Sequence, residues 1–315
     1  APGSPIFDLC CGIGGDTAAM ARSTGHRESV ITAIDRDPFM EAMATENLRL
    51  NTPVNDLSLS FRCDDVLNLQ LTNDATVHID PDRRDDAGRK TRPEDYSPAW
   101  NLVEQMVDRC DAAIIKLAPA AELQDRDGRH RLWISLAGTV REQTLLMNRS
   151  INLASFDLGI SLREGGRSAI VVNREGQAFS YSGNVPDGKC GRTDQPAGYM
   201  VDPDAAVRAA GLTESFALGH ELQLLGGPAG FLTGQSAIES DVAICEPIVW
   251  SGSCDDRQLR KTLRSMNCFP WRVKTRGVSQ NPNILEKRYR QCGETPVTLW
   301  IGKGAKRHYA VMTES

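Results

Sequence analysis

The chain has 315 residues, of which 40% are hydrophobic and 24% are charged. This length accommodates one large or two ordinary domains with a substantial core. No apolar run approaches the ~18 residues of a membrane-spanning helix and no signal peptide is visible, so we expect a soluble, cytoplasmic protein without a membrane partner.

The metal-binding residue types are dispersed along the chain. The nine cysteines and five histidines form neither a Cys-x-x-Cys pair nor a cluster at metal-ligand spacing. This pattern favours reduced thiols in a cytoplasmic protein and predicts no metal site. The sequence opens directly on a predicted strand without an initiator methionine, so we expect a further segment upstream.

Charge is distributed unevenly. The whole chain carries a net charge of −5, from 36 basic and 41 acidic residues. Residues 255–315 contain 13 Lys/Arg and 5 Asp/Glu, a net charge of +8, which leaves −13 for the first 254 residues. The segregation favours contact between the C-terminal part and an anionic polymer; a solvated basic face without a partner is the alternative.

The first strong motif comes at the start of the chain. A short apolar strand runs into residues 8–17, with the sequence DLCCGIGGDT, and a helix follows. Strand, glycine-rich turn and helix form the arrangement with which open α/β sheets bind nucleotides. The carboxylate of Asp8 stands four residues before Gly12, and Thr17 occupies the third small position, so the pattern is DxxxGxG rather than GxGxxG.

The following elements predict a Rossmann-like α/β fold. Strands are expected at 29–34, 57–62, 75–79, 112–115, 132–136 and 167–172, and helices at 38–50 and 100–109, while 139–147 is ambiguous. Strands that alternate with helices in this way imply a parallel sheet.

A stretch rich in Gly, Ser, Asp and Pro, residues 179–198, is the predicted domain boundary. Beyond it we expect helices at 203–210, 255–266 and 281–291 and strands at 244–250, 271–275, 297–301 and 308–312. The predicted domains are therefore residues 1–180, which form the α/β domain, and residues 199–315, which form a smaller α+β domain.

Aspartates mark the ends of the predicted strands. Asp35, Asp65 and Asp80 each follow a strand, and Asp8 lies just inside the first. Ligands of open α/β sheets bind outside these strand ends, so we expect the four carboxylates to line one crevice. An acid after the second strand can accept hydrogen bonds from both hydroxyls of a ribose. An acid after the third strand can accept a hydrogen bond from an exocyclic amine such as N6 of adenine, and the Val66 N–H can donate to the ring nitrogen. Each aspartate by itself could simply cap a helix or turn.

Segments 8–14, 33–35, 63–66 and 79–81 resemble successive motifs of the class I S-adenosylmethionine-dependent methyltransferases. Four further segments, DPDRR at 80–84, YSPAW at 96–100, KLAP at 116–119 and KTRG at 274–277, are similar to bacterial methyltransferases with a C-terminal THUMP-like domain. The glycine turn is also similar to that of the trimethylguanosine synthase family, which methylates a guanine amine on RNA. The resemblance implies a Rossmann-like methyltransferase sheet followed by a smaller, RNA-binding THUMP-like α+β domain.

The resemblance also implies the cofactor, S-adenosyl-L-methionine, and the residues that bind it. Asp8 and the glycine turn would hold the methionine part, Asp35 the ribose and Asp65 the adenine. The full implied set is Asp8, Cys10, Gly12, Gly14, Gly15, Asp16, Asp35, Arg36, Asp65, Val66 and Asp80.

Asp80, Pro81 and Arg83 are the candidate catalytic residues. Asp80 and Pro81 occupy the place of the Asn/Asp-Pro-Pro-aromatic tetrapeptide of amine methyltransferases, but Asp82 replaces the second proline and Arg83 the aromatic residue. A sulfonium methyl group is already activated, so positioning a nucleophile at ~3 Å and providing a route for its proton supply most of the acceleration. Asp80 is the candidate to accept that proton or a hydrogen bond from the attacking N–H.

The acceptor side is expected to include Arg84, Tyr96, Trp100 and Lys116. Arg83 and Arg84 could clamp a phosphate or pair with the neighbouring aspartates. The two aromatic residues could stack a flipped base, or pack in the core. Lys116 ends a strand on the same edge of the sheet.

A second group of substrate-binding candidates lies in the basic C-terminal part. Arg272, Lys274 and Arg276 alternate along a predicted strand and so share one face, which could follow a phosphate backbone. The sequence as a whole predicts a methyltransferase acting on a tRNA or rRNA base. The alternatives are a methyltransferase of a small molecule or protein and a non-catalytic cofactor-binding module; Thr17 disfavours a nicotinamide-binding dehydrogenase. Oligomeric state is not predicted.

Overall fold

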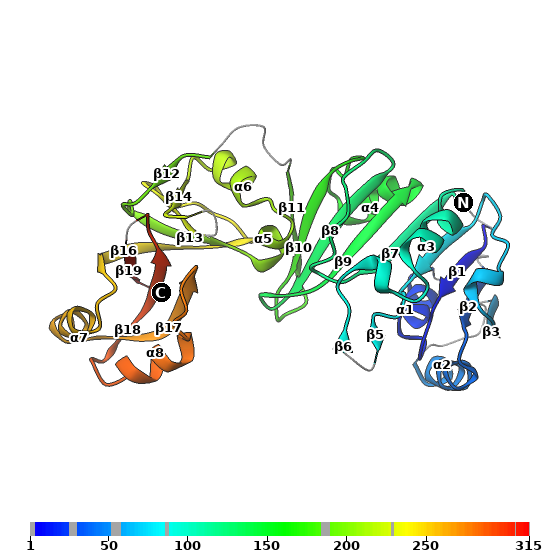
Figure 1. Ribbon diagram of the computed structural model, residues 1–315, viewed down its shortest axis with the longest axis horizontal. Coiled ribbons are helices and arrows are strands. Elements are labelled where there is room, and N and C mark those ends of the chain that lie inside the picture. Colours follow the sequence, from blue (N-terminus) through cyan, green and yellow to red (C-terminus); the bar gives the residue numbers. More distant parts are fainter. Residues whose placement is uncertain are drawn as a thin grey trace. The chain divides into compact units, whose positions relative to one another are not determined.

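The computed structural model describes residues 4–24, 30–51, 58–85, 88–183, 190–227, 230–305 and 307–314 (Figure 1). The chain divides into two compact units, residues 1–182 and 183–315. The division falls at the start of the Gly-, Ser-, Asp- and Pro-rich stretch.

The first unit is built on a nine-stranded sheet in the order β11-β10-β8-β9-β7-β4-β1-β2-β3. Its strands are β1 (Ile6–Leu9), β2 (Val30–Asp35), β3 (Ser58–Cys63), β4 (Thr76–Ile79), β7 (Ala112–Leu117), β8 (Arg129–Leu136), β9 (Thr139–Asn148), β10 (Arg167–Val172) and β11 (Ala178–Gly183). Its helices are α1 (Gly15–Thr24), α2 (Pro38–Asn51), α3 (Trp100–Val107) and α4 (Arg149–Leu158). Two 3-10 turns, η1 (Val66–Asn68) and η2 (Pro93–Asp95), and a small ribbon, β5 (Arg84–Asp85) with β6 (Gly88–Arg89), complete the described elements.

The sheet is mixed rather than fully parallel. Strands β3, β2, β1, β4 and β7 run parallel, and the strand order reverses at β1. Strand β9 is antiparallel to both β7 and β8. Only Ala137 and Gly138 connect β8 to β9, and both have positive φ angles, 51° and 79°, as a two-residue hairpin turn requires. This hairpin resolves the ambiguous segment 139–147 as a strand.

Apolar side chains cover the centre of this sheet. Leu9, Val77, Ile79 and Ile115 come from the three central strands and are fully buried in one cluster, against which Val103 of α3 packs. Since these strands cannot slide without exposing their apolar residues, the cluster fixes the level at which they end.

The second unit has an eight-stranded sheet in the order β12-β14-β15-β13-β16-β19-β18-β17. Its strands are β12 (Arg192–Thr193), β13 (Tyr199–Pro203), β14 (Gln223–Leu225), β15 (Phe231–Gly234), β16 (Ala243–Ser253), β17 (Cys268–Arg276), β18 (Thr295–Lys303) and β19 (His308–Thr313). Its helices are α5 (Ala205–Ala209), α6 (Thr213–Gly219), α7 (Asp256–Ser265) and α8 (Pro282–Tyr289). The sheet is mostly antiparallel, with parallel pairs at its two edges, β12 with β14 and β17 with β18.

The second unit differs from the sequence expectation in several elements, since β13, β14, β15 and α6 were not predicted. Strand β12 lies within the stretch predicted as a connection. Pro203 ends β13 instead of opening a helix, and α5 starts after Asp204, whose side chain accepts the Ala206 N–H at 2.8 Å.

The core of the second unit surrounds Trp300, which is fully buried, donates its Nε1–H to Thr313 Oγ1 at 2.8 Å and meets Phe231 edge-on. Leucines of α7 and Tyr289 of α8 pack in a neighbouring cluster with β17, β18 and β19. Among the described residues of both units, no helix has the length and apolarity needed to cross a membrane.

Candidate cofactor and acceptor site

A crevice of about 830 Å³ opens at the carboxyl ends of the parallel strands of the first unit. The predicted site residues that line it are Cys10, Gly12, Asp35, Arg36, Asp65, Val66, Asp80, Pro81 and Arg83. Sequence reasoning missed Ile13, Asp37, Met40, Leu67, Asp82, Ser97 and Pro98, which line it as well. Apart from Met40 on α2, these missed residues lie within or next to the predicted motifs; the pair Ser97–Pro98 belongs to the segment YSPAW. This pair reaches the crevice because Ser97 and Asp82 exchange backbone hydrogen bonds of 2.9 and 3.0 Å.

The glycine turn is held in one conformation by hydrogen bonds to the end of β2. The Cys11 N–H donates to the Ile34 carbonyl at 3.1 Å, and the Gly12 N–H donates to Asp35 Oδ2 at 2.9 Å. Gly14 has φ +78°, and a Cβ there would stand 2.9 Å from that of Ala44 on α2. Glycine is needed at this position both for the conformation and for the close approach of α2.

The crevice aspartates also act as local caps. Asp35 Oδ1 accepts the Asp37 N–H at 3.0 Å, and Asp65 accepts the Leu67 N–H at 2.9 Å at the start of η1. Each carboxylate has about four acceptor positions, so these bonds leave capacity for a ligand. Capping and ligand binding, which the sequence presented as alternatives, are therefore compatible.

Asp80 lies between two cations. Arg83 Nη2 is 3.3 Å from Asp80 Oδ1, and Lys116 Nζ is 3.9 Å from Oδ2. The Arg83 side chain is only 14% exposed, and its Nη1 is buried without a hydrogen-bond partner in the described part of the chain. A buried guanidinium N–H at the wall of a crevice is an unused donor that a bound ligand can satisfy.

The two thiols of the glycine turn are kept protonated. Burial raises the pKa of Cys10 to about 12, with further contributions from the charges of Asp35 and Asp80. Burial also raises the pKa of Cys11 to about 12, and the carboxylates of Asp8 and Asp35 add to the effect. Neither thiol is therefore available as a thiolate nucleophile at neutral pH.

Asp8 does not reach the crevice, contrary to the role that the family resemblance implied. Its side chain is 1% exposed, Oδ1 accepts the His78 Nδ1–H at 2.8 Å, and Oδ2 accepts the Thr17 hydroxyl. It is a positioning residue that joins β1, β4 and α1. His78 was missed in the sequence; it stands directly opposite Asp8 in the register of β1 and β4, which only the strand pairing reveals.

Asp16 and Lys116 also lie outside the crevice lining. Lys116 Nζ is 2.7 Å from Asp16 Oδ2 and 3.9 Å from Glu142 Oε2. Burial lowers the pKa of Lys116, but the hydrogen bond and charge of Asp16, with Glu142 and Asp80, outweigh it, so the pKa is raised. Lys116 thus pairs with residues of this chain instead of presenting a free amine to the acceptor. Neither Gly14, packed on α2, nor the exposed Gly15 lines the crevice.

Tyr96 and Trp100 pack in the core, so in this structure they are not a platform for a flipped base. Their exposed fractions are 4% and 9%, and both belong to the cluster beneath the parallel strands. The Tyr96 hydroxyl accepts the Ala118 N–H at 3.1 Å. The side chain of Arg84 lies outside the described part of the structure.

The basic residues of β17 are neutralised inside the second unit and do not form a free cationic face. Asp202 on β13 is 6% exposed and contacts three cations: Lys274 at 2.7 Å, Arg276 at 3.0 Å and Arg208 at 3.0 Å. Arg272 pairs in the same way with Glu246 of β16. Burial raises the pKa of Asp202, but the positive charges of Lys274, Arg276 and Arg208 outweigh it and lower the pKa.

Comparison with known proteins identifies the class. None of the protein-family models compared with the chain matches it. Uncharacterised S-adenosylmethionine-dependent methyltransferases from two Mycobacterium tuberculosis strains are 30% identical over 97% of this chain and 80% of their own length. Carboxy-S-adenosyl-L-methionine synthases of Shewanella are 32% identical over 24% of this chain and 30% of their own length.

A solved structure of a presumed methyltransferase from Porphyromonas gingivalis W83 shares the fold, with a TM-score of 0.74 and 18% identity over 98% of this chain and 76% of that one. Together with the crevice at the switch point of an α/β sheet, the long match to the mycobacterial proteins defines the class. The chain belongs to the S-adenosylmethionine-dependent methyltransferases, and its methyl donor is S-adenosyl-L-methionine. The described residues contain no group of three or more His, Cys, Asp or Glu arranged to hold a metal ion.

The Asp8–His78 pair predicts a pH-dependent stability. Burial lowers the pKa of His78, but the hydrogen bond and charge of Asp8 and the charge of Asp16 raise it above the ordinary value of 6.5. The stabilisation is therefore complete below pH 6.5 and is lost as the pH rises through the folded pKa. We expect His78→Gln to lower the free energy of unfolding by about 1–3 kcal/mol at acidic pH and by less above neutrality. Urea unfolding at graded pH, with His308→Gln as the control, measures this; equal losses at every pH would contradict it.

Asp202 provides a second test of the geometry. Asp202→Ala leaves three cations clustered without their buried counter-charge, so we expect a loss of about 3–5 kcal/mol in the free energy of unfolding of the second unit. Hydrogen exchange of β13 and β17 amides, followed by mass spectrometry in full-length protein, reports the loss locally. The exposed Asp241→Ala is the matched control and should change stability by less than about 0.5 kcal/mol. Unchanged exchange in Asp202→Ala would show that the three cations do not depend on this carboxylate.

Proposed function

We propose that the chain methylates RNA, at a base of a tRNA or an rRNA, with the acceptor bound beside Asp80 and Pro81. The observation that carries the proposal is the combination of an acidic cofactor crevice in the first unit with a net charge of +8 over residues 255–315. Such charge segregation suits an enzyme whose donor is a small cation and whose acceptor is a polyanion.

The residues of the crevice fit the cofactor. Asp35 has the acceptor capacity for two ribose hydroxyls, and Asp65 with the Val66 N–H offers one acceptor and one donor for the adenine edge. Gly12 brings the backbone of the turn to the crevice wall, where the methionine part would lie, with Cys10 and Arg36 beside it. The carboxylates of Asp35 and Asp80 give this wall the negative charge that suits a sulfonium. Asp8 and Gly14 support the turn through their contacts with the neighbouring strands and helices, and Asp16 pairs with Lys116.

The bound cofactor supplies an activated methyl group, so the protein has to position the acceptor and accept its proton. Asp80 is the carboxylate at the end of β4, and Arg83 and Lys116 keep it in place. An acceptor N–H can donate to its remaining lone pairs. The unpaired Nη1 of Arg83 can bind an oxygen of the acceptor, a carbonyl of a base or a phosphate.

The second unit is the part that we propose to contact RNA, as a THUMP-like module. Three of its basic residues, on β17, are neutralised internally, but others are exposed on α7, on α8 and at the turn between β18 and β19. The internal pairing of β17 is the observation that favours the alternative, a small-molecule or protein acceptor, because it reduces the cationic surface available to a nucleic acid.

Nucleoside analysis tests the function directly. The protein is incubated with isotope-labelled S-adenosyl-L-methionine and total RNA from a strain that lacks the gene, and the digested RNA is examined by mass spectrometry. We expect label in one modified nucleoside, and Asp80→Asn to reduce its formation by about 100-fold, well beyond any weakening of cofactor binding that follows from the lost negative charge. Label that enters only protein or small molecules from an extract would contradict an RNA acceptor and support the alternative.

Cofactor affinity tests the site independently of the acceptor. Removing the Asp65 carboxylate should weaken S-adenosyl-L-methionine binding by about 10- to 100-fold, because a charged hydrogen bond contributes about 1.5–3 kcal/mol. Isothermal titration calorimetry of Asp65→Ala and Asp65→Asn measures this, and the amide variant should retain part of the affinity. Asp74→Ala, an exposed change in the same unit, is the matched control. Equal affinity of wild type and Asp65→Ala would remove Asp65 from the cofactor site.

A further inference from the structure

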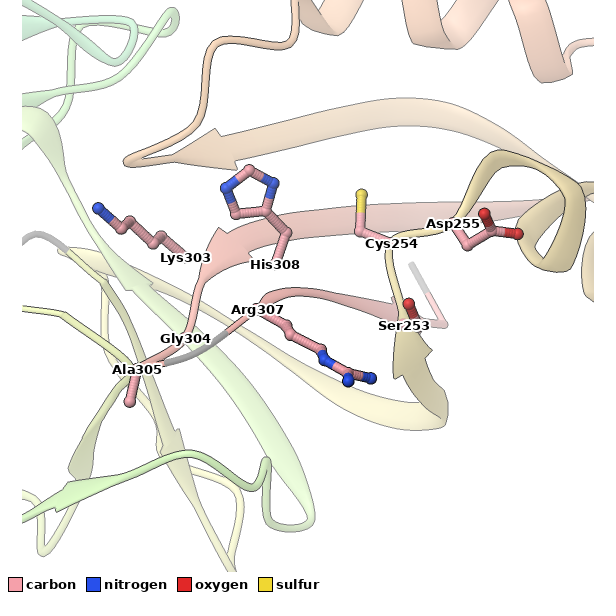
Figure 2. Close-up of a pocket in the computed structure, with 8 residues that line it drawn as sticks. All are labelled: Ser253, Cys254, Asp255, Lys303, Gly304, Ala305, Arg307 and His308. Atoms are coloured by element: carbon pink, nitrogen blue, oxygen red, sulfur yellow. The ribbon is translucent and has the colours of Figure 1, made fainter.

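Three pockets in the second unit are lined by the turn between β18 and β19. One, of about 390 Å³, lies between the turn and Ser253–Asp255 (Figure 2). Another, of about 480 Å³, lies between the turn and residues of β12 and Gly226–Gly227. A third, of about 520 Å³, extends along residues 194–196. All three are lined by Gly304 and Ala305, and we call these hollows together the turn groove.

Hydrogen bonds connect the described residues of the turn to one another and to their surroundings. The Gly304 N–H donates to the Arg307 carbonyl at 2.8 Å, and the Ala305 N–H donates to Asp194 Oδ1 at 2.9 Å. The Gly227 N–H donates to the Lys303 carbonyl at 3.3 Å. A Cβ on Gly226 would lie 2.2 Å from that carbonyl oxygen, so only glycine permits this contact. The walls of the turn groove are therefore preformed, which lowers the entropic cost of binding a ligand there.

Cations of the turn groove lack the neutralisation seen on β17. Lys303 and Arg307 are exposed and form no ion pair within the described residues, and Figure 2 shows them pointing in opposite directions from the turn. Arg192, which also lines the groove, differs from these two because it forms an ion pair with Glu214 at 3.8 Å. The two acids of the groove, Asp194 and Asp255, accept the backbone N–H groups of Ala305 and Gln258. Among the described residues, neither acid forms an ion pair with Lys303 or Arg307. Lys306 lies outside the described residues.

We propose that the turn groove binds phosphate groups of the RNA backbone, with Lys303 on one side of the turn and Arg307 on the other. The inference rests on the proposed function, since it assigns the surface that holds the RNA acceptor. Two cations that form no ion pair among the described residues and diverge from one turn can contact two phosphates of one strand. The glycines let the backbone come close without side chains in between. The exposed cations of α7, Lys261 and Arg264, carry the same charge but line none of these hollows.

Salt-dependent binding of labelled bulk tRNA, measured by fluorescence anisotropy on the full chain, tests the proposal. Lys303→Ala/Arg307→Ala should weaken binding at least 10-fold at low salt. It should also lower the slope of log Kd against log salt concentration by about 1.4–1.8, the value for two lost phosphate contacts. Lys261→Ala/Arg264→Ala removes the same charge from α7 and should weaken binding less than 2-fold. Lys303→Arg/Arg307→Lys keeps both charges and should bind as wild type does, and thermal melting checks that each variant is folded.

The outcomes separate this inference from the proposed function. An equal loss in the two alanine variants, or none in the turn-groove variant, would overturn the groove while wild-type binding and methylation of RNA still stand. Wild-type protein that neither binds tRNA nor labels RNA would overturn the proposed function, and the inference with it. That failure is seen before any variant is compared.

Discussion

The buried carboxylate of Asp8 is the interaction on which the crevice depends. It joins β1 to β4 through His78 and to α1 through Thr17, and these are the elements between which the glycine turn passes. A buried charge of this kind is tolerated only when its acceptor positions are satisfied, so the three side chains must be arranged together or not at all. The contacts of Asp8 therefore hold both ends of the glycine turn, where it leaves β1 and where it enters α1. The hydrogen bond from the Gly12 N–H to Asp35 holds its middle. This explains why a residue that does not line the crevice is part of its motif.

The electrostatics of the crevice follow from this construction. Carboxylates gather at the strand ends because each also serves a local backbone group, as Asp35 does for Asp37 and Asp65 for Leu67. Their negative charge contributes to the raised pKa of Cys10, and it is the charge that a sulfonium needs around it. A single set of carboxylates thus stabilises the turns, keeps the thiol neutral and suits a cationic donor.

Sequence reasoning was most effective where a residue's role is set by its position at a strand end. Asp35, Asp65 and Asp80 could be assigned to one crevice because parallel strands bring their carboxyl ends together whatever the side chains pack against. Roles that depend on packing across the sheet could not be read in this way. Tyr96 was a candidate for base stacking because the sequence does not show whether its side chain is exposed. In the structure it is 4% exposed.

Pairing between distant residues was also beyond the sequence. Alternation correctly placed Lys274 and Arg276 on one face of a strand, but it could not tell which side of that face is covered. Their partner Asp202 is 72 residues before Lys274 and belongs to a strand that is not adjacent to β17 in the sheet. The segment 139–147 was ambiguous for a related reason. It forms a strand because the two-residue turn at Ala137 and Gly138 brings it back alongside β8, and this pairing cannot be read from the segment itself.

Whether a cation of the second unit is neutralised or remains available to a ligand therefore depends on whether an acid is buried next to it. The cations of β17 form ion pairs with the buried carboxylates of Asp202 and Glu246, and these pairs stabilise the fold. At the β18–β19 turn, Asp194 and Asp255 accept backbone N–H groups, and among the described residues neither forms an ion pair with Lys303 or Arg307, which are exposed. Net charge alone places both groups in one basic region. Only the second group can raise the local concentration of a polyanion, because field lines from a neutralised pair end within the protein.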